Sequence, residues 1–186
     1  GGLCGGEEVV VVGGGNSAGQ AAVYLSSVAR KVWMLVRGEG LAASMSDYLI
    51  RRIDAARNIE LLCRTQVTAL DGDDCLRRVD WARRDTGSAG GADAAHLFLM
   101  IGAAPNTEWL GDAVAKDDRG FICTGTDLIA NHAWSHDRPP QPFETSLPRV
   151  FAVGDARSGS VKRVASAVGE GSVCVQFVHR ALAAGG

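Results

Sequence analysis

The residues best suited to chemistry are small ones that follow a short apolar segment near the start of the chain. Gly13, Gly15 and Ala18 have the spacing G-x-G-x-x-A, directly after four valines that end at Val12. In such a turn the first glycine permits a sharp bend, the second lets a pyrophosphate approach the backbone, and the small third residue lets a helix lie close to the strand. The helix start offers free N–H groups and a positive dipole end to phosphate oxygens. This pattern predicts a dinucleotide site formed by Gly13, Gly14, Gly15, Asn16, Ser17 and Ala18. The alternative is a tight strand–helix turn without a ligand.

The residue that ends the second expected strand indicates which dinucleotide is bound. NAD-specific sites place Asp or Glu about 20 residues after the turn, where the carboxylate binds the ribose 2′-hydroxyl. Arg37 holds that place here, and its guanidinium suits a 2′-phosphate. We therefore predict NADP(H), with two alternatives open: Arg37 is a solvated turn residue, or Glu39 contacts a ribose hydroxyl. Ser44 and Ser46 precede the next helix, and we expect at least one of them to cap it rather than to bind phosphate.

The elements that position these residues alternate as in a Rossmann-like fold. Apolar, β-branched runs predict strands over residues 7–12, 32–36 and 59–63. Helical spacing predicts one helix that ends at about Arg30 and another from Ser44 to about Arg57. Strand–helix–strand–helix–strand is the first half of a doubly wound parallel sheet, so the expected class is α/β.

A change of pattern predicts an insertion and then a second domain. Alternating residues over 66–70 and 76–83 predict a hairpin, and a polar turn over 85–91 leads to a buried strand over 96–101, so we expect a β-meander inserted before the last parallel strand. The pattern changes after Ile101. We therefore expect an NAD(P)H-binding domain over 1–101 and a second domain over 102–186. In the second we expect a strand over 149–153 and a long helix over 161–183.

Composition excludes several kinds of partner. The 186 residues are 46% hydrophobic and 22% charged, with a net charge of −2. This gives no basic field for nucleic acid or for an anionic membrane surface. No apolar run approaches the roughly 20 residues that span a bilayer, and the glycine-rich, acidic start is unlike a signal peptide.

The cysteines and histidines predict neither a disulfide nor a metal site. The five cysteines are scattered, odd in number and without a CxxC pair. We interpret them as buried, reduced thiols of a cytoplasmic protein. The four histidines show no metal-ligand spacing with cysteines or carboxylates.

Four motifs, in the same order as in a known family, resemble those of thioredoxin reductases. Residues 9–18 resemble the opening of the family's NADPH domain, and residues 101–107 resemble its return to the FAD domain. Residues 145–155 resemble its late FAD motif, and Lys162-Arg163-Val164 stands where the family has Arg-Gln-Ala. The resemblance is strongest to a branch whose late motif reads like residues 159–171, some members of which carry a cyclic-nucleotide-binding domain upstream.

The resemblance implies a flavin-dependent oxidoreductase and assigns further cofactor-binding residues. Gly102 lies in the return segment. Asp155 would bind a hydroxyl of the FAD ribityl chain; the alternative is a turn or N-cap aspartate. Lys162, Arg163 and Val164 would bring backbone N–H groups at a helix start to the flavin pyrimidine, where they stabilise negative charge on the reduced ring. The resemblance also implies a homodimer.

Three departures from the family pattern qualify these implications. Cys4 stands alone before the glycine turn, so a CxxC pair is either absent or precedes residue 1. The family's arginine cluster for the 2′-phosphate is reduced to Arg37, with Gly38 and Ala42 at the other places. The first half of the FAD domain is missing, and the chain does not begin with Met, so we expect a fragment that does not hold FAD by itself.

Two functions are therefore compared. In the first, NADPH passes hydride to FAD, and the flavin passes electrons to an unidentified acceptor, with no catalytic residue assigned in this chain. In the second, the chain is a non-catalytic NADP-binding sensor or regulatory module. Asp155 and residues 162–164 favour the first, whereas the missing half favours the second for this chain alone.

Overall fold

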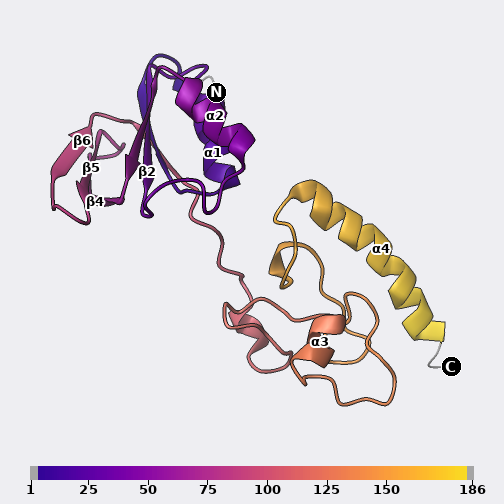
Figure 1. Cartoon of the computed structure of the whole chain (residues 1–186). Helices are drawn as coiled ribbons and strands as arrows, with labels where there is room; N and C mark the ends of the chain where they lie inside the picture. Colours follow the sequence, from indigo (N-terminus) through magenta and orange to yellow (C-terminus); the bar gives the residue numbers. More distant parts are fainter. Residues whose placement is uncertain (1–3, 184–186) are drawn as a thin grey trace. The chain divides into compact units, whose positions relative to one another are not determined.

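The computed structural model describes residues 4–183, and the chain divides into two compact units, Gly1–Gly102 and Ala103–Gly186 (Figure 1). Each unit has its own set of elements and is described separately below.

A four-stranded parallel sheet forms the centre of the first unit. Its strands are β1 (Glu8–Val12), β2 (Lys31–Val36), β3 (Ile59–Cys63) and β7 (His96–Leu99), in the order β3-β2-β1-β7. The β-branched run of β1 is apolar without alternation because both faces of a central parallel strand are covered. Val9, Val10 and Val11 are accordingly all fully buried.

Two helices cover one face of this sheet. α1 (Asn16–Leu25) and α2 (Asp47–Ala55) pack on Val9 and Val11 through small or aliphatic residues such as Ala18 and Leu49. α1 ends before the expected Arg30, because Ser26 and Ser27 turn their hydroxyls onto carbonyls of the preceding turn.

An antiparallel sheet covers the other face, where a doubly wound fold usually places helices. Its strands are β4 (Thr65–Asp71), β5 (Arg78–Arg83) and β6 (Ala89–Ala92), in the order β4-β5-β6. Trp81 of β5 packs against Trp33 of β2 with ring centroids 5.1 Å apart and ring planes tilted by 46°, in a core that includes Val10. The α/β class, the Rossmann-like parallel sheet and the inserted meander are thus confirmed.

The third strand of the meander lies largely within the segment expected to be a polar turn. Its sequence, Ala-Gly-Gly-Ala, has little strand propensity. A Cβ at Gly90 would lie 2.6 Å from the indole nitrogen of Trp81. Glycine therefore lets β6 pair closely with β5 beside this large ring, a tertiary requirement that local propensity does not reveal.

The second unit contains little regular structure before its last helix. Its elements are η2 (Glu108–Leu110), α3 (Thr126–Ala130), η3 (Gly154–Ala156) and α4 (Val164–Ala183). The expected strand over 149–153 is wrong: Arg149 has φ 68°, and only an isolated bridge joins Glu144 to Phe151. The carboxylate of Glu144, fully buried, organises this region by accepting hydrogen bonds from Arg138 and from the N–H groups of Gln141 and Arg149.

Within residues 4–183, no helix is long and apolar enough to cross a membrane. The same residues contain no group of three or more His, Cys, Asp or Glu side chains placed to hold a metal ion.

Candidate functional site

Gly13 lies where three parallel strands of the first unit meet, and the fold itself requires a glycine there. Its φ is +142°, and a Cβ would lie 2.4 Å from the carbonyl oxygen of Met100, just beyond β7. Its N–H donates to Leu35 O of β2 at 3.0 Å. Gly13 therefore bends the chain out of β1 between the ends of β2 and β7, as the sequence pattern predicts.

Gly15 is different, because no contact among the described residues requires a glycine at this position. It has φ −91° and ψ 178°, which any residue adopts, and a Cβ would have no neighbour nearer than Ser44 O at 4.0 Å. The missing side chain thus leaves open space beside the backbone. This is the arrangement expected where a ligand, rather than the protein, needs the room.

The start of α1 is open to an anion. Gly15 occupies its N-cap position without a side-chain cap, and the first turn carries no acidic residue. The N–H groups of Asn16, Ser17 and Ala18 precede the first intrahelical hydrogen bond, from Gly19 N–H to Gly15 O. Ala18 itself is fully buried and lets the helix lie close to β1, since its Cβ would be 3.1 Å from a Cβ at Gly13.

A cavity of about 1320 Å³ opens in front of this turn. Its walls come from the glycine turn, the segment after β2, the start of β4 and the end of β7. They include these residues predicted to bind the cofactor: Gly13, Gly14, Gly15, Asn16, Ser17, Arg37 and Gly102. The structure therefore brings those seven residues together, with Ala18 directly behind them.

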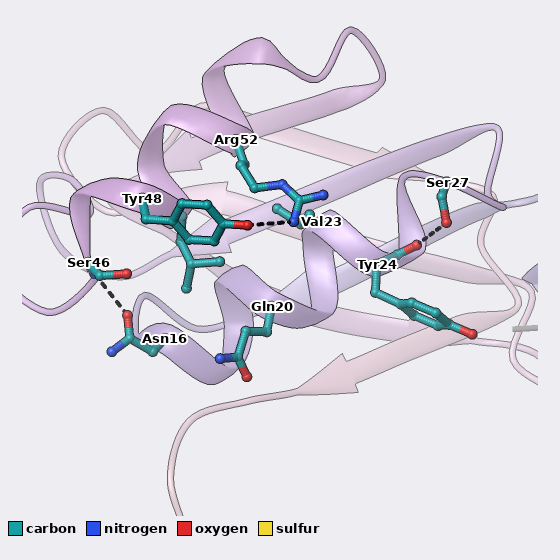
Figure 2. A pocket seen from close by; sticks show the side chains of 9 residues that line it. Asn16, Gln20, Val23, Tyr24, Ser27, Ser46, Tyr48 and Arg52 are labelled. Carbon is teal, nitrogen blue, oxygen red and sulfur yellow. Dashed lines mark hydrogen bonds between the residues drawn. The ribbon is translucent and has the colours of Figure 1, made fainter.

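Ser46 occupies the N-cap position of α2, but the side-chain capping bond expected for Ser44 or Ser46 does not form. Neither side chain caps α2; Ser44 Oγ instead donates to Gly14 O at 2.9 Å. The Ser46 N–H donates to Asn16 Oδ1 at 2.8 Å, a contact that Figure 2 shows between the starts of α2 and α1. Both bonds tie the glycine turn to the segment after β2, so these residues position the turn.

A second, smaller hollow of about 430 Å³ lies between α1 and α2 (Figure 2). Its rim includes Tyr24 of α1 and Tyr48 and Arg52 of α2, and Arg52 Nη1 donates to the Tyr48 hydroxyl at 3.1 Å. Asn16 contributes to both hollows, and its side-chain oxygen is already bound to Ser46. Its backbone N–H and its side-chain Nδ2 remain as donors for a phosphate.

The segment after β2 presents charges of both signs to the larger cavity. Arg37 is exposed on the cavity wall. Glu39 also lines the cavity, but its Oε1 lies 2.8 Å from Arg64 Nη2 in an ion pair. Sequence motifs do not mark Arg64. It could have been found only by noting that it follows β3, the strand that runs parallel beside β2.

In the second unit, Asp155 lies exposed in η3, on a turn that α4 fixes. Gly154, with φ 71°, donates its N–H to Glu170 Oε2 at 2.7 Å, and Arg157 forms an ion pair with the same carboxylate. The Arg157 guanidinium lowers the pKa of Glu170, with a further contribution from the Gly154 N–H against the opposing effect of burial. Glu170 thus remains an anion that holds the Asp155 turn.

The remaining predicted residues lie just before and at the start of α4. Lys162 Nζ donates to Arg157 O at 3.1 Å and to Ser160 Oγ at 2.7 Å, so its ammonium has internal partners. The Arg163 N–H donates to Val161 O at 2.8 Å. Of these backbone donors, the N–H of Val164 stands at the first position of the helix, where no intrahelical acceptor exists.

All five cysteines are free. Cys4, Cys123 and Cys174 are buried as expected, Cys63 is half-buried, and Cys75 is exposed in the β4–β5 turn region, contrary to the expectation for a buried thiol.

Comparison with known proteins agrees with this geometry. The chain is 28% identical over 176 residues to thioredoxin reductase from Chlamydia trachomatis, covering 95% of this chain and 51% of the relative. It is 28% identical over 167 residues to NADH dehydrogenase from Ferdinandcohnia aciditolerans, covering 90% of this chain and 29% of the relative. The solved thioredoxin reductase of T. acidophilum superposes with a TM-score of 0.74 at 29% identity, over 96% of this chain and 53% of that one.

The family model for pyridine nucleotide-disulphide oxidoreductases matches residues 4–171, almost the whole chain. The chain nevertheless spans only about a third to a half of the length of the curated relatives it matches. The glycine turn at β1, the inserted meander and the match over both units together place this chain in the pyridine nucleotide-disulphide oxidoreductase family, as a thioredoxin-reductase-like member.

Proposed function

We propose that the first unit binds NADPH, with the pyrophosphate at the start of α1 and the 2′-phosphate near Arg37. The observation that carries this proposal is the open space beside Gly15, which faces a cavity of about 1320 Å³ and an uncapped helix. Backbone N–H groups and a helix dipole bind phosphate without needing any charged side chain. Arg37 supplies the positive charge that a 2′-phosphate needs and a 2′-hydroxyl does not.

The proposal extends to the whole protein as an NADPH-dependent flavoprotein oxidoreductase. FAD, when bound, supplies the chemistry that accepts hydride from the nicotinamide. The residues of this chain bind and orient: Asp155 offers an exposed carboxylate to a polyol, and Val164 offers an N–H at a helix start. Glu170 and Arg157 hold the Asp155 turn in place. The electron acceptor is unidentified, and NADP specificity rests on Arg37.

An apolar stripe along α4 supports the view that the rest of the FAD domain lies outside these residues. Five aliphatic side chains recur at helical spacing on one face and are 37–83% exposed: Val164, Val168, Val175, Val178 and Leu182. Cys174 and Ala181 lie on a different face and are buried. A contiguous apolar stripe of this kind normally packs against another part of the protein. We propose that the remaining part of a FAD domain covers this stripe. The matched thioredoxin reductases are about twice as long as this chain, which leaves room for such a part.

A second candidate is a non-catalytic NADP-binding module. It is favoured by one feature, the completeness of the nucleotide cavity within the first unit, which needs no residue from the second. The two candidates share nucleotide binding and differ only in whether the protein holds a flavin and reduces it.

Calorimetric titration of NADPH into the 186-residue chain tests the shared step. Gly15→Val fills the open space and should abolish binding, while circular dichroism and the melting temperature stay close to wild type. Gly169→Val is the matched control, since a Cβ there meets nothing within 4 Å and Gly169 lies in α4 of the second unit, outside the residues that line the nucleotide cavity. Normal binding by Gly15→Val would show that the turn is structural only.

A further inference from the structure

Arg64 directly precedes Thr65, which lines the nucleotide cavity, and lies beside the segment that carries Arg37. It follows β3 directly. Val36 pairs with Cys63 in the parallel ladder, so the segments that follow β2 and β3 leave the sheet side by side. The Arg64 N–H donates to Gly38 O at 2.8 Å. Arg64 also has φ 55°, a left-handed conformation that a bulky residue rarely adopts. The backbone here is shaped to join the end of β3 to the segment after β2.

The guanidinium of Arg64 is held in place on one side. Its Nη1 lies 3.3 Å from Asp85 Oδ2. The Asp85 carboxylate also accepts hydrogen bonds from Nε and Nη2 of Arg83, at 3.1 and 2.9 Å. The hydrogen bonds from Arg83 lower the pKa of Asp85 despite partial desolvation, so this carboxylate stays charged. The Arg64 carbonyl accepts a hydrogen bond from the Arg84 N–H at 2.7 Å, which fixes the backbone as well.

On its other side Arg64 holds a partner that can be exchanged. Nη2 lies 2.8 Å from Glu39 Oε1, and the Glu39 side chain is 85% exposed. An exposed ion pair contributes little to stability. A phosphate group carries more negative charge and three acceptor oxygens, which makes it a stronger partner for a planar guanidinium than one carboxylate oxygen.

We propose that Arg64 is a specificity-determining residue for NADP(H), which exchanges Glu39 for the 2′-phosphate when the nucleotide binds. Arg64 keeps its contact with Asp85 while Nη2 passes from the Glu39 carboxylate to a phosphate oxygen, opposite Arg37. NADH carries no group that can displace Glu39, so the Arg64–Glu39 ion pair remains intact when NADH binds. This inference rests on the proposed nucleotide site and adds a second cation to it, in a chain whose segment after β2 has Gly38 and Ala42 beside Arg37.

The test uses two probes that differ only in the 2′-phosphate, 2′,5′-ADP and 5′-AMP, titrated into the full chain by calorimetry. Arg64→Gln should weaken 2′,5′-ADP by about three- to ten-fold and leave 5′-AMP unchanged. Glu39→Gln should strengthen 2′,5′-ADP, because the competitor is gone, and again leave 5′-AMP unchanged. Arg77→Gln is the matched control for loss of one positive charge, since Arg77 pairs with Asp73 in the turn after β4, at the far end of that strand from Arg64. It should alter neither probe.

The double variant separates direct contact from simple neutralisation of Glu39. If Arg64 binds the phosphate, Arg64→Gln still weakens 2′,5′-ADP in the Glu39→Gln background. If the second substitution has no effect there, Arg64 only neutralises Glu39 and the inference is overturned. Unchanged or weaker 2′,5′-ADP binding by Glu39→Gln also overturns the inference. If Arg64→Gln does not fold, the Glu39→Gln result alone tests the inference. Failure of the underlying site looks different, because the wild-type chain would then bind neither probe nor NADPH.

Discussion

The Cα of Gly13 lies against the carbonyl oxygen of Met100, so that any Cβ at position 13 would stand 2.4 Å from that oxygen. Met100 is fixed in turn by its own N–H, which donates to Val12 O at 2.7 Å. Neither the segment at Gly13 nor the segment at Met100 can move without breaking the ladder between β1 and β7. The two glycines of one turn therefore differ: Gly13 is needed by the fold, whereas the space beside Gly15 is open and is where we propose that the ligand binds.

This contrast predicts opposite results for two alanine substitutions. Gly13→Ala should destabilise the protein by about 2–3 kcal/mol, from a positive φ and a backbone clash. Gly15→Ala adopts an allowed conformation, meets no neighbour and should leave the free energy of unfolding unchanged or slightly raised. Urea unfolding of both variants measures the difference. Equal costs at the two positions would contradict the assignment of Gly13 to the fold and of Gly15 to the ligand.

A second prediction concerns Arg37. Arg37→Ala should reduce the preference for NADPH over NADH by about ten-fold, because one charge-assisted contact to the 2′-phosphate is lost while the shared pyrophosphate contacts remain. Titration of both nucleotides gives the ratio. Arg57→Ala, which removes a charge just after α2, is the control and should leave the ratio at its wild-type value. If the wild-type protein bound NADPH and NADH equally well, the assignment of Arg37 to the 2′-phosphate would be wrong.

The third prediction is a pH dependence that originates at Glu144. Burial alone raises the pKa of this carboxyl, but hydrogen bonds from Arg138 and from the N–H groups of Arg149 and Gln141 outweigh it and lower the pKa from 4.5 to about 2. A carboxyl whose pKa is lower in the folded state contributes stability above its unfolded pKa. That contribution is present at neutral pH and disappears as the pH falls from about 4.5 to about 2.

Glu144→Gln should therefore lower the free energy of unfolding by about 2 kcal/mol at pH 7, a value reduced for the partial exposure of Arg138. The difference from wild type should shrink as the pH falls below 4.5. Glu108→Gln removes an exposed carboxylate from the same unit and should cost almost nothing. A Glu144→Gln deficit that stays constant between pH 7 and pH 3 would show that packing, and not charge, is lost.

The fourth prediction distinguishes the cysteines by accessibility. A thiol reagent such as DTNB should modify Cys75 first in the native protein, because Cys75 is exposed. Cys123 and Cys174 should react slowly, since burial raises the pKa of both thiols and hinders access. Denatured, unreduced protein should give five free groups, and Cys75→Ser should remove the fast phase. A count of three would reveal a disulfide and restore a thiol redox mechanism.

Several features were predictable from sequence because their causes are local. A run of valines followed by glycines at fixed spacing predicts β1 and its turn without knowledge of any partner strand. Other features depend on contacts made across the fold. The turn at Arg149 exists because its N–H reaches the buried Glu144, and so the expected strand there does not form. The pairing of Arg64 with Glu39 follows from strand order, which single-sequence patterns do not give.

Gly19 illustrates a requirement that motif reading missed in the glycine turn itself. The G-x-G-x-x-A spacing predicts no role for it, yet a Cβ there would lie 2.7 Å from the sulfur of Met45, which precedes α2. A larger residue there would force the Met45 side chain to move, so the preference for glycine comes from the packing of α1 against α2 and the segment before it, and no spacing rule contains that information. Ser44 and Ser46 were misassigned for a related reason, since both bind across to the turn and the start of α1 instead of capping their own helix.

The last prediction concerns the flavin. In the proposed function, Asp155 and the start of α4 in the second unit would bind the ribityl chain and the flavin ring, but the glycine turn of this chain lies in the first unit and is proposed to bind NADPH. A flavin held only through its ribityl and ring ends lacks pyrophosphate contacts at a helix start, usually the principal anchor. The 186-residue chain should therefore purify colourless, bind NADPH, and show negligible NADPH oxidase activity.

A longer form that adds the proposed remainder of a FAD domain should be yellow, with absorbance near 450 nm, and should cover the apolar stripe of α4. Asp155→Ala in that form should weaken FAD retention, whereas Asp112→Ala, an exposed aspartate of the same unit, should not. Val168→Asp should impair assembly of the longer form while leaving NADPH binding by the first unit intact, because that binding needs no residue of α4. Stoichiometric flavin on the 186-residue chain would refute the need for further residues. A longer form that binds NADPH but stays colourless would instead favour the non-catalytic module, since nucleotide binding would then exist without an electron carrier to receive the hydride.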